Sequence, residues 1–566
     1  MRVARARRVG VGILVTVVGS GTVVAGTGWA GVAGAATSRG ASAATSRPGA
    51  GVGALPTSAS QLLAVDVRAG RHPISPGIYG VNWPDPGLAA ALRLPVQRWG
   101  GNAVSRYNDV TNTSNTGSDW FFENITRTPA QSLASFVATG RKTRTASIVT
   151  VPMTGWVAKA SPASHPYTCG FPSSAFPQQD QHDPWDAGCG NGVAGGVELA
   201  ASPQTTSQPA GPDWVKAMVG RLVAANGTAA HGGVPYYELD NEPSLWSSTH
   251  RDVHPAKLTY NELAARSTAT AAAVKAADPS AKVLGPSDWG WCAWFFSAAD
   301  GCSAGADRAA HAGMDLTPWY LRQLKAYQTA HGVRLLDYLD QHYYPQGGTW
   351  TTGAGDAATQ AKRLRSTRSL WDPTYVDESW IGKPVMLVPR MKAWVAAEYP
   401  GTKLSISEYS FGAIGTLNGA LAQADALGIF GWQGVDLATL WGPPKPTDPG
   451  AFAFRMYRNY DGRGAAFGDV AVGLRSRSPG SLAVYAAQRT SDGALTVMVI
   501  NKSGAAITTR TALAGFSPAG AAARYTYSGA RLGAIVHGAN VATTATGWSA
   551  TYPASSITLL VIPKKR

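Results

Sequence analysis

Two glutamates of the sequence each stand at the end of an apolar, strand-like segment. Residues 236–243 read YYELDNEP, so an apolar strand runs into polar residues that include Glu242, and a proline then stops the strand. Residues 404–409 read LSISEY and place Glu408 similarly, at the end of a second strand. Carboxyl side chains at the ends of buried strands can act as acids, bases or nucleophiles when they reach one cleft.

Two carboxyl groups about 5–5.5 Å apart can hydrolyse a glycosidic bond by double displacement. One group attacks the anomeric carbon, and the other protonates the leaving oxygen and then deprotonates the incoming water. We assign the nucleophile to Glu408 and the acid/base to Glu242, and we expect Asn241 to bind the sugar 2-hydroxyl. Asn-Glu-Pro alone is a common loop tripeptide, so the hypothesis requires that both glutamates reach one site.

The segment 76–449 supplies the elements that would position these side chains, because eight candidate strands alternate there with helical segments. This pattern predicts a (β/α)₈ TIM barrel, with an open doubly wound sheet as the alternative. Glu242 and Glu408 then end strands four and seven, at the carboxyl face where such barrels form their active sites. The candidate strands are Gly77–Trp83, Pro95–Gly101, Ala146–Pro152, Val234–Asn241, Lys282–Ser287, Leu335–Tyr344, Lys403–Tyr409 and Gly434–Trp441.

The segment 450–566 has a different pattern, in which short strands are separated by turns, and it predicts an all-β sandwich. Residues 59–75 contain a further strand-like run, Leu62–Arg68, which we expect to join this sandwich from the front of the chain. The expected C-terminal strands are Leu482–Ala487, Ala494–Asn501, Ala505–Leu513, Ala523–Ser528 and Ile557–Pro563.

The first 35 residues are typical of a secretory signal peptide. Four arginines precede an apolar run at 9–24, and residues 33–35 form an A-x-A cleavage site. A retained membrane anchor is the alternative, but the run is rich in glycine and shorter than about 20 strongly apolar residues. Residues 36–58 are mainly Ala, Gly, Ser and Thr and predict a flexible linker. We therefore expect an extracellular protein that is free of the membrane after cleavage.

The net charge of +15 raises the question of nucleic-acid binding. Lys and Arg are scattered, apart from those in the leader and at 564–566, which is typical of a solvated surface, so no nucleic-acid partner is expected.

The four cysteines allow three pairings. The short loops Cys169–Cys189 and Cys292–Cys302 are the economical choice in an exported chain, and zinc binding is the alternative although no C-x-x-C pair occurs.

Longer motifs around the two glutamates resemble those of glycoside hydrolase family 44, whose members are endoglucanases and xyloglucanases. They are RWGGN at 98–102 with SRYN at 105–108, GSDWFFEN at 117–124, DNEPSLW at 240–246 leading to His250, and SEY at 407–409. The resemblance covers about residues 60–560. It implies a barrel fused to a β-sandwich, retention of configuration and cleavage inside β-1,4-glucan chains, and it supports the roles of Glu242 and Glu408.

Further residues are expected to bind substrate. Arg98 and Asn102, at the end of strand two, would contact sugar hydroxyls or hold Glu408, with a buried structural ion pair as the alternative. His342 and Tyr344 would orient a glutamate or contact substrate, and the expected sugar-stacking side chains, each of which could instead be core, are Trp120, Trp371, Trp380 and Trp441.

The chemistry of the carboxyl pair requires no cofactor. The resemblance implies a structural calcium, for which oxygen ligands are offered by Glu123 and by Asp180, Asp183 and Asp186, although an acidic loop is often only solvated. The expected partner is a β-glucan, and we expect a monomer. A β-mannanase or xylanase on the same barrel is an alternative function. A non-catalytic glycan-binding barrel is another, and the presence of both glutamates and Asn241 argues against it.

Overall fold

The computed structural model describes residues 62–565. The expected signal peptide at 1–35 and the expected linker at 36–58 lie outside the described residues. Within the described part of the chain, no helix combines the length and the apolar character needed to span a membrane.

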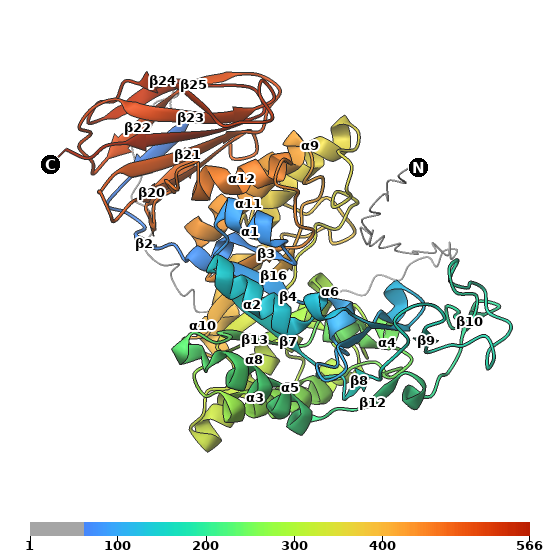
Figure 1. Cartoon of the computed structure of the whole chain (residues 1–566). Helices are drawn as coiled ribbons and strands as arrows, with labels where there is room; N and C mark the ends of the chain where they lie inside the picture. The colour runs from blue at the N-terminus through green and yellow to red at the C-terminus, as the bar shows by residue number, and fades with distance from the viewer. Residues whose placement is uncertain (1–61, 566) are drawn as a thin grey trace, which may run out of the picture. The chain divides into compact units, whose positions relative to one another are not determined.

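Eight parallel strands close into a barrel, which confirms the predicted (β/α)₈ fold and excludes the open sheet (Figure 1). The fourth strand pairs with the third and the fifth, and the eighth pairs with the first. The strands in chain order are β3 (Gly80–Asn82), β4 (Val96–Trp99), β7 (Ala146–Val151), β13 (Tyr236–Leu239), β14 (Lys282–Asp288), β15 (Tyr338–Gln341), β16 (Lys403–Tyr409) and β17 (Leu437–Leu440).

Helices follow the barrel strands and cover their outer faces. Several begin at a side chain that accepts a backbone N–H, as Asp85, Ser132 and Thr416 do, which satisfies groups that a helix start leaves unpaired. The helices are α1 (Pro86–Leu92), α2 (Leu133–Thr143), α3 (Pro212–Asn226), α4 (Trp246–Thr249), α5 (Tyr260–Ala277), α6 (Trp291–Phe295), α7 (Ala306–Ala310), α8 (Leu316–His331), α9 (Ala357–Ser366), α10 (Leu387–Glu398), α11 (Leu417–Gln433) and α12 (Pro449–Arg458).

Short strands outside the barrel occupy the segments that follow β4 and β7. They form a three-stranded sheet β5-β6-β9 and two two-stranded sheets, β8-β12 and β10-β11. Disulfides join Cys169 to Cys189 in this region and join Cys292, in α6, to Cys302. The strands are β5 (Thr113–Asn115), β6 (Glu123–Thr126), β8 (Trp156–Ala158), β9 (Thr168–Cys169), β10 (Val193–Ala194), β11 (Val197–Glu198) and β12 (Ser207–Pro209).

The C-terminal strands form two sheets with a separate apolar core between them. One sheet has the order β19-β1-β22-β25, in which the early strand β1 runs parallel to β22. The other has the order β2-β18-β20-β21-β26-β23-β24. The strands are β1 (Leu63–Asp66), β2 (His72–Pro73), β18 (Val470–Ala471), β19 (Gly473–Ser476), β20 (Leu482–Gln488), β21 (Leu495–Asn501), β22 (Ile507–Ala514), β23 (Ala522–Ser528), β24 (Val536–Val541), β25 (Gly547–Tyr552) and β26 (Ser556–Ile562).

Strand β20 is buried on both faces, which explains why its sequence is almost entirely apolar. Leu482 and Val484 face the core between the two sheets, whereas Tyr485 lies in the larger core that also contains the barrel helices. Helix α11 packs against β20 and β21, and the buried amine of Lys502 donates to Asp425 of α11 at 2.8 Å. The barrel and the sandwich are therefore joined by apolar packing and by a buried ion pair.

Candidate active site

The backbone after β13 turns sharply and aims Glu242 out of the strand. Asp240 and Glu242 both adopt left-handed conformations, with φ of 64° and 47°, which cost an L-residue about 1–2 kcal/mol each. The carboxylate of Asp240 accepts the backbone N–H of Met153 at 2.6 Å, and the N–H of Glu242 donates to the carbonyl of Ser287 at 3.0 Å. Neighbouring strands thus hold the conformation that points this glutamate into the site.

Glu408 lies in β16, on the opposite side of the barrel mouth. One carboxylate oxygen of Glu242, one of Glu408 and a ring nitrogen of His342 lie within 4.8 Å of one another. The side chains of Glu242 and Glu408 are 13% and 8% exposed, so both are nearly buried and still reach solvent. The structure therefore brings together the two predicted glutamates.

Arg98 of β4 is completely buried and positions Glu408. Its Nη1 donates to Glu408 at 2.8 Å, its Nε bonds both carboxylate oxygens of Glu238, and its Nη2 donates to Asn241 at 2.8 Å. Gly100 lies against this guanidinium, and a side chain there would collide with it. The geometry matches two of the expected roles for Arg98, since it holds Glu408 and also forms a buried ion pair with Glu238.

His342 and Tyr344 follow β15 and bind the two glutamates directly. Nδ1 of His342 lies 3.1 Å from a carboxylate oxygen of Glu242, and its Nε2 lies 3.2 Å from the hydroxyl of Ser407. The phenol of Tyr344 donates to Glu408 at 2.6 Å. Both side chains therefore orient the carboxyl pair.

A buried polar network inside the barrel supports these residues, and it was not predicted from the sequence. The hydroxyl of Ser407 lies 2.7 Å from Glu238 and 2.6 Å from Asp340 and, having one proton, can donate to only one of them at a time. Thr150 donates to Glu238 at 2.6 Å. The available signal was the presence of polar residues within predicted buried strands, as at Asn82, Thr150, Glu238, Asp340 and Ser407.

Charges inside the site shift the protonation of its groups. Burial raises the pKa of Glu408, and the neighbouring charge of Glu242 acts in the same direction. The positive charges of His342 and Arg98 oppose this rise. Burial alone would lower the pKa of His342, but the surrounding carboxylates outweigh it and raise the pKa to about 10. His342 is therefore a cation at neutral pH and can donate from both ring nitrogens.

A chain of amides leads from Asn241 towards the rim of the cleft. Asn241 donates to Asn102 at 2.9 Å, and Asn102 donates to the two carboxylate oxygens of Asp119 at 3.2 and 3.1 Å. Trp120, which follows Asp119, is partly buried and stacks against Trp185 with ring centroids 5.0 Å apart. Trp185 was not among the expected site residues.

Two of the remaining tryptophans lie near the carboxyl pair. The ring of Trp441, directly after β17, packs on Gly101, whose φ of 92° and missing side chain leave room for the indole. Trp380 is 57% exposed and donates to Gln346, which in turn donates to the carbonyl of Tyr344. Both indoles are therefore connected to cleft residues.

Trp371 has the contacts of a core side chain. It is partly buried and packs edge-on against Trp432, with ring centroids 4.9 Å apart. Trp432 lies near the end of α11 that leads into the start of β17, whereas the carboxyl pair lies at the ends of the strands. This packing argues against the expected role of Trp371 in binding substrate.

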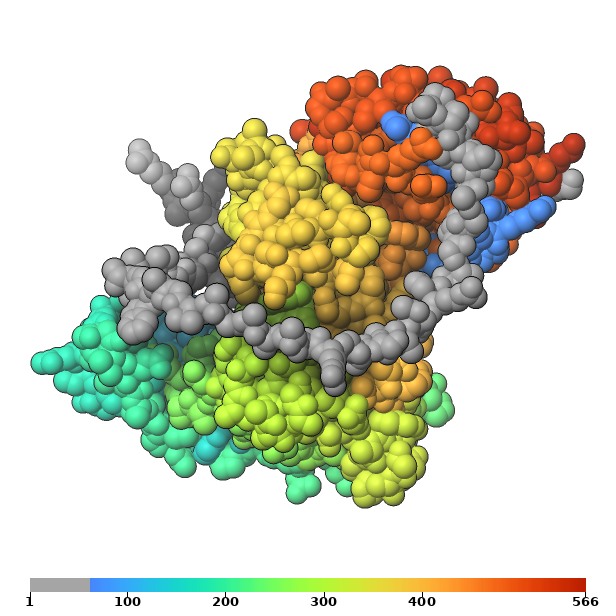
Figure 2. Space-filling model, turned by 180° about the vertical axis from the view of Figure 1, so that it is seen from behind, coloured from blue at the N-terminus to red at the C-terminus, as the bar shows by residue number. Residues whose placement is uncertain are grey.

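The segment between β15 and α10, which carries Trp371 and Trp380, forms a continuous yellow surface in Figure 2.

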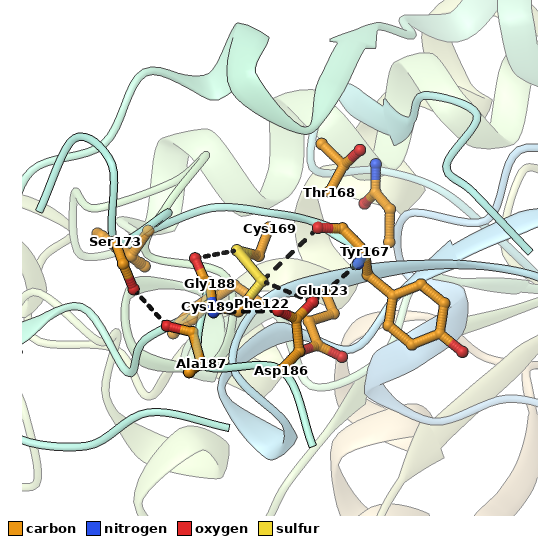
Figure 3. Close-up of a disulfide and its surroundings, with 12 residues drawn as sticks. Phe122, Glu123, Tyr167, Thr168, Cys169, Ser173, Asp186, Ala187, Gly188 and Cys189 are labelled. Atoms are coloured by element: carbon orange, nitrogen blue, oxygen red, sulfur yellow. Dashed lines mark hydrogen bonds between the residues drawn. A yellow bond between two sulfur atoms is a disulfide. The ribbon is translucent and has the colours of Figure 1, made fainter. Parts of the chain in front are cut away.

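Glu123 and Asp186 lie beside the Cys169–Cys189 disulfide (Figure 3), and Asp183 is close to Glu123. Glu123 Oε1 and Asp183 Oδ2 are buried without a hydrogen-bond partner, and a carboxylate oxygen of Asp186 lies within 4.8 Å of one of Glu123. Burial, followed by the nearby Asp183 and Asp186, raises the pKa of Glu123 to about 9. Unpaired hard oxygens of this kind fit a calcium ion.

Asp180, which was also expected to offer a ligand, has a different role. Its two carboxylate oxygens accept the backbone N–H groups of Gly195 and Gly196 at 2.7 and 2.9 Å. These glycines form the turn between β10 and β11, so Asp180 stabilises that turn and stands apart from the acidic cluster.

The chain is similar to known proteins in sequence and in structure. The model of glycoside hydrolase family 44 matches residues 113–347. CelM2, a bifunctional glucanase-xylanase from a metagenome library, has a solved structure that is 40% identical, with a TM-score of 0.86 over 89% of this chain and 99% of that one. A family 44 xyloglucanase from Paenibacillus polymyxa is 30% identical, with a TM-score of 0.74 over the same shares of the two chains.

Two curated relatives extend beyond this chain. Endoglucanase A of Paenibacillus lautus is 34% identical over 77% of this chain and 63% of its own length. The β-mannanase/endoglucanase A of Caldicellulosiruptor saccharolyticus is 31% identical over 78% of this chain and 34% of its own length. The chain thus spans less than two thirds of either relative.

A closed (β/α)₈ barrel with paired glutamates at the ends of strands four and seven, seen in a chain with these relatives, defines a glycoside hydrolase. The presence of both glutamates in one site argues against the expected alternative of a non-catalytic glycan-binding barrel. The chain belongs to glycoside hydrolase family 44, as the sequence motifs had indicated.

Proposed function

We propose that the chain is an exported endo-acting hydrolase of β-1,4-glucans that retains the anomeric configuration. The observation that carries this proposal is the separation of at most 4.8 Å between a carboxylate oxygen of Glu242 and one of Glu408. Retaining enzymes need their carboxyl groups about 5–5.5 Å apart, whereas inverting enzymes leave about 6.5–9.5 Å for a water molecule.

Glu408 is the proposed nucleophile because its carboxylate accepts bonds from Arg98 and Tyr344, which stabilise the ionised form and fix its direction. Glu242 is the proposed acid/base. Among the described residues, His342 is its one side-chain partner, so the second oxygen of Glu242 is left for the leaving group and the water. Asn241, held by Arg98 and Asn102, is placed to bind the sugar 2-hydroxyl.

In the proposed first step, Glu408 attacks the anomeric carbon while Glu242 gives its proton to the departing glycosidic oxygen. In the second step, Glu242 takes a proton from water, and the water oxygen displaces Glu408 from the sugar. The carboxyl pair needs no cofactor for either step.

The preferred glucan is proposed from the relatives. The endoglucanase and xyloglucanase relatives favour cellulose-type chains or xyloglucan. CelM2, described as a glucanase-xylanase, makes xylan the second candidate. The mannanase name carries little weight, because the chain matches only 34% of that protein.

The test is reducing-sugar release from soluble cellulose, xyloglucan, xylan and mannan, together with NMR of the first anomer formed. We expect cleavage of a glucan with the β-anomer appearing first. We expect Glu242→Gln and Glu408→Gln each to lose at least about 100-fold in kcat, with Glu198→Gln, an exposed carboxyl on β11, as the matched control. No activity on the four polymers, or an α-anomer first, would contradict the proposal.

Calcium is proposed as a structural ion at the acidic cluster, held by Glu123, Asp183 and Asp186. It would supply positive charge to carboxylates that the protein leaves unpaired and would brace β6 against the loop 169–189. The ion has no role in the proposed hydrolysis.

Export and domain limits are also proposed. We propose cleavage of residues 1–35, a linker at 36–58, a sandwich strand in 59–75, a barrel at 76–449 and a sandwich at 450–566. The arginines and apolar run of the leader support export. Sequencing the N-terminus of protein from the culture medium tests it, with residue 36 as the expected start, and retention of the intact leader in the membrane fraction would contradict it. We also propose a monomer, which light scattering tests.

A further inference from the structure

Trp185 is the most exposed tryptophan among the large apolar side chains that the structure describes, with 70% of its surface accessible. It lies in the loop closed by the Cys169–Cys189 disulfide, outside the barrel. Its ring stacks on that of Trp120 at 5.0 Å, with an angle of 27° between the planes. The exposed indole offers a flat apolar face on which a ligand could stack.

The stacking changes what Trp120 can do. Trp185 covers one face of the Trp120 ring, and Phe121 packs edge-on against Trp120 at 5.3 Å. The flat surface offered to solvent at this place is therefore the outward face of Trp185. The sequence suggested that Trp120 stacks on a sugar, but Trp185 is the side chain that offers a free ring face, and Trp120 packs behind it.

The indole pair is linked to the active site through Asp119, the residue before Trp120. Trp120 follows Asp119, which accepts bonds from Asn102, and Asn102 in turn accepts a bond from Asn241. Asn241 precedes the acid/base Glu242 in the sequence. A glucan chain that occupies the cleft beside Asn241 and extends past Asn102 would reach these indoles.

The loop that carries Trp185 is built to hold it in place. The backbone N–H of Trp185 donates to Asp183 at 3.0 Å. Asp186 accepts backbone N–H groups from Tyr167 at 2.8 Å and from Gly188 at 3.0 Å, and Cys189 closes the loop three residues later. A preorganised aromatic face loses little conformational entropy when a ligand stacks on it.

We propose that Trp185 is a sugar-stacking residue at an outer subsite, where it binds a glucose ring of a long β-glucan chain several units from the bond that is cut. This inference rests on the proposed function, because it assumes a β-glucan in the cleft. It separates substrates by length: polymers reach Trp185, and short oligosaccharides that fill only the centre of the cleft do not.

The test compares kinetics on xyloglucan or soluble cellulose with kinetics on a short chromogenic cello-oligosaccharide. Trp185→Ala should raise KM for the polymer about tenfold with little change in kcat, and should change kcat/KM for the short substrate by less than about twofold. Trp185→Tyr should retain most of the polymer affinity. Val197→Ala, an apolar residue of the same region that is 67% exposed, is the control and should match the wild type.

An unchanged KM for the polymer in Trp185→Ala would overturn the inference. An equal loss on long and short substrates would also overturn it, because that pattern indicates a damaged cleft. The proposed function is tested separately by the wild type: if the wild type cleaves no β-glucan, the function fails, whatever the variants do. Polymer binding to Glu242→Gln and to Glu242→Gln/Trp185→Ala, measured by calorimetry, then decides the stacking role without turnover.

Discussion

The guanidinium of Arg98 joins Glu408 to the interior of the barrel, because Nη1 donates to Glu408 at 2.8 Å while Nε binds Glu238 at 2.8 Å. Burial is unfavourable for the charge of Arg98, but the charges of Glu238 and Glu408 outweigh it and hold the pKa of Arg98 above its usual value. Glu408 is thus fixed in direction by a completely buried side chain.

Arg98→Lys keeps the charge but loses the forked geometry, so we expect kcat/KM at neutral pH to fall by about 100-fold. Arg98 lowers the pKa of Glu408 against burial. Weakening that effect raises the pKa, and the nucleophile must be ionised, so the acid limb of kcat/KM should move up by about one pH unit. A pH–rate profile checks this, with Arg221→Lys at the partly exposed pair with Asp109 as control. An unmoved acid limb would show that Arg98 has only a structural role.

The contribution of His342 to the free energy of unfolding should decrease as the pH rises from neutral to alkaline values. Its pKa is about 10 in the folded protein and about 6.5 when unfolded. When folding raises a pKa, the resulting stabilisation is fully present at pH values below the unfolded pKa. It is lost as the pH rises through the folded pKa. His342→Gln should therefore lower the free energy of unfolding more at pH 6 than at pH 9, by about 1–3 kcal/mol. Urea unfolding at the two pH values measures the difference, and a pH-independent effect would disprove the charged imidazole.

The ion pair between Lys502 and Asp425 should contribute strongly to stability, because the two side chains are only 1% and 2% exposed. Lys502→Met leaves the Asp425 carboxylate buried without its cation, and we expect a loss of about 3–5 kcal/mol. Denaturant unfolding measures it. Lys502→Met combined with Asp425→Leu should recover part of the loss. Arg322→Met, at a pair whose arginine is 55% exposed, should cost much less than Lys502→Met, because water screens the exposed pair. Equal losses in the buried and exposed variants would refute this explanation.

Removing calcium should destabilise the protein without altering the chemical step. A chelator should lower Tm by several degrees, and added calcium should restore it, since an ion that binds only the folded state stabilises by mass action. Activity measured well below the new Tm should persist. Glu123→Gln, which removes one carboxylate of the cluster, should reduce the response of Tm to the chelator. A Tm that ignores both chelator and calcium would exclude the site.

The barrel could be predicted because its strands are buried on both faces and so appear as short, mainly apolar runs, as in residues 146–151, ASIVTV. In the sandwich, β24 reads VHGANV and was not predicted. It lies at the end of its sheet, most of its residues are exposed, and a strand that buries so little has no apolar pattern. Strand β25, GWSATY, was also missed, although its buried Trp548, Ala550 and Tyr552 alternate with exposed residues as in a half-buried strand.

The candidate site also contains residues that could be predicted from the sequence and residues that could not. Glu242 and Glu408 were found because each ends a strand. The partners of Arg98 were incompletely predicted, since Glu238 and Asn82 become its neighbours only when distant strands close into a ring. Trp185 had no signal of its own, because its meaning depends on Trp120 in another segment.

The position of β1 in the sandwich also sets the order in which the protein can be completed during synthesis. Residues 63–66 leave the ribosome first, but their partners β19 and β22 follow roughly 400 residues later. Until then the apolar segment LAVD has no neighbours, and an unpaired strand is prone to aggregate. In a chain that is interrupted before β22, strand β1 therefore lacks its partner β22. We expect such fragments to depend on chaperones even when the barrel itself is complete.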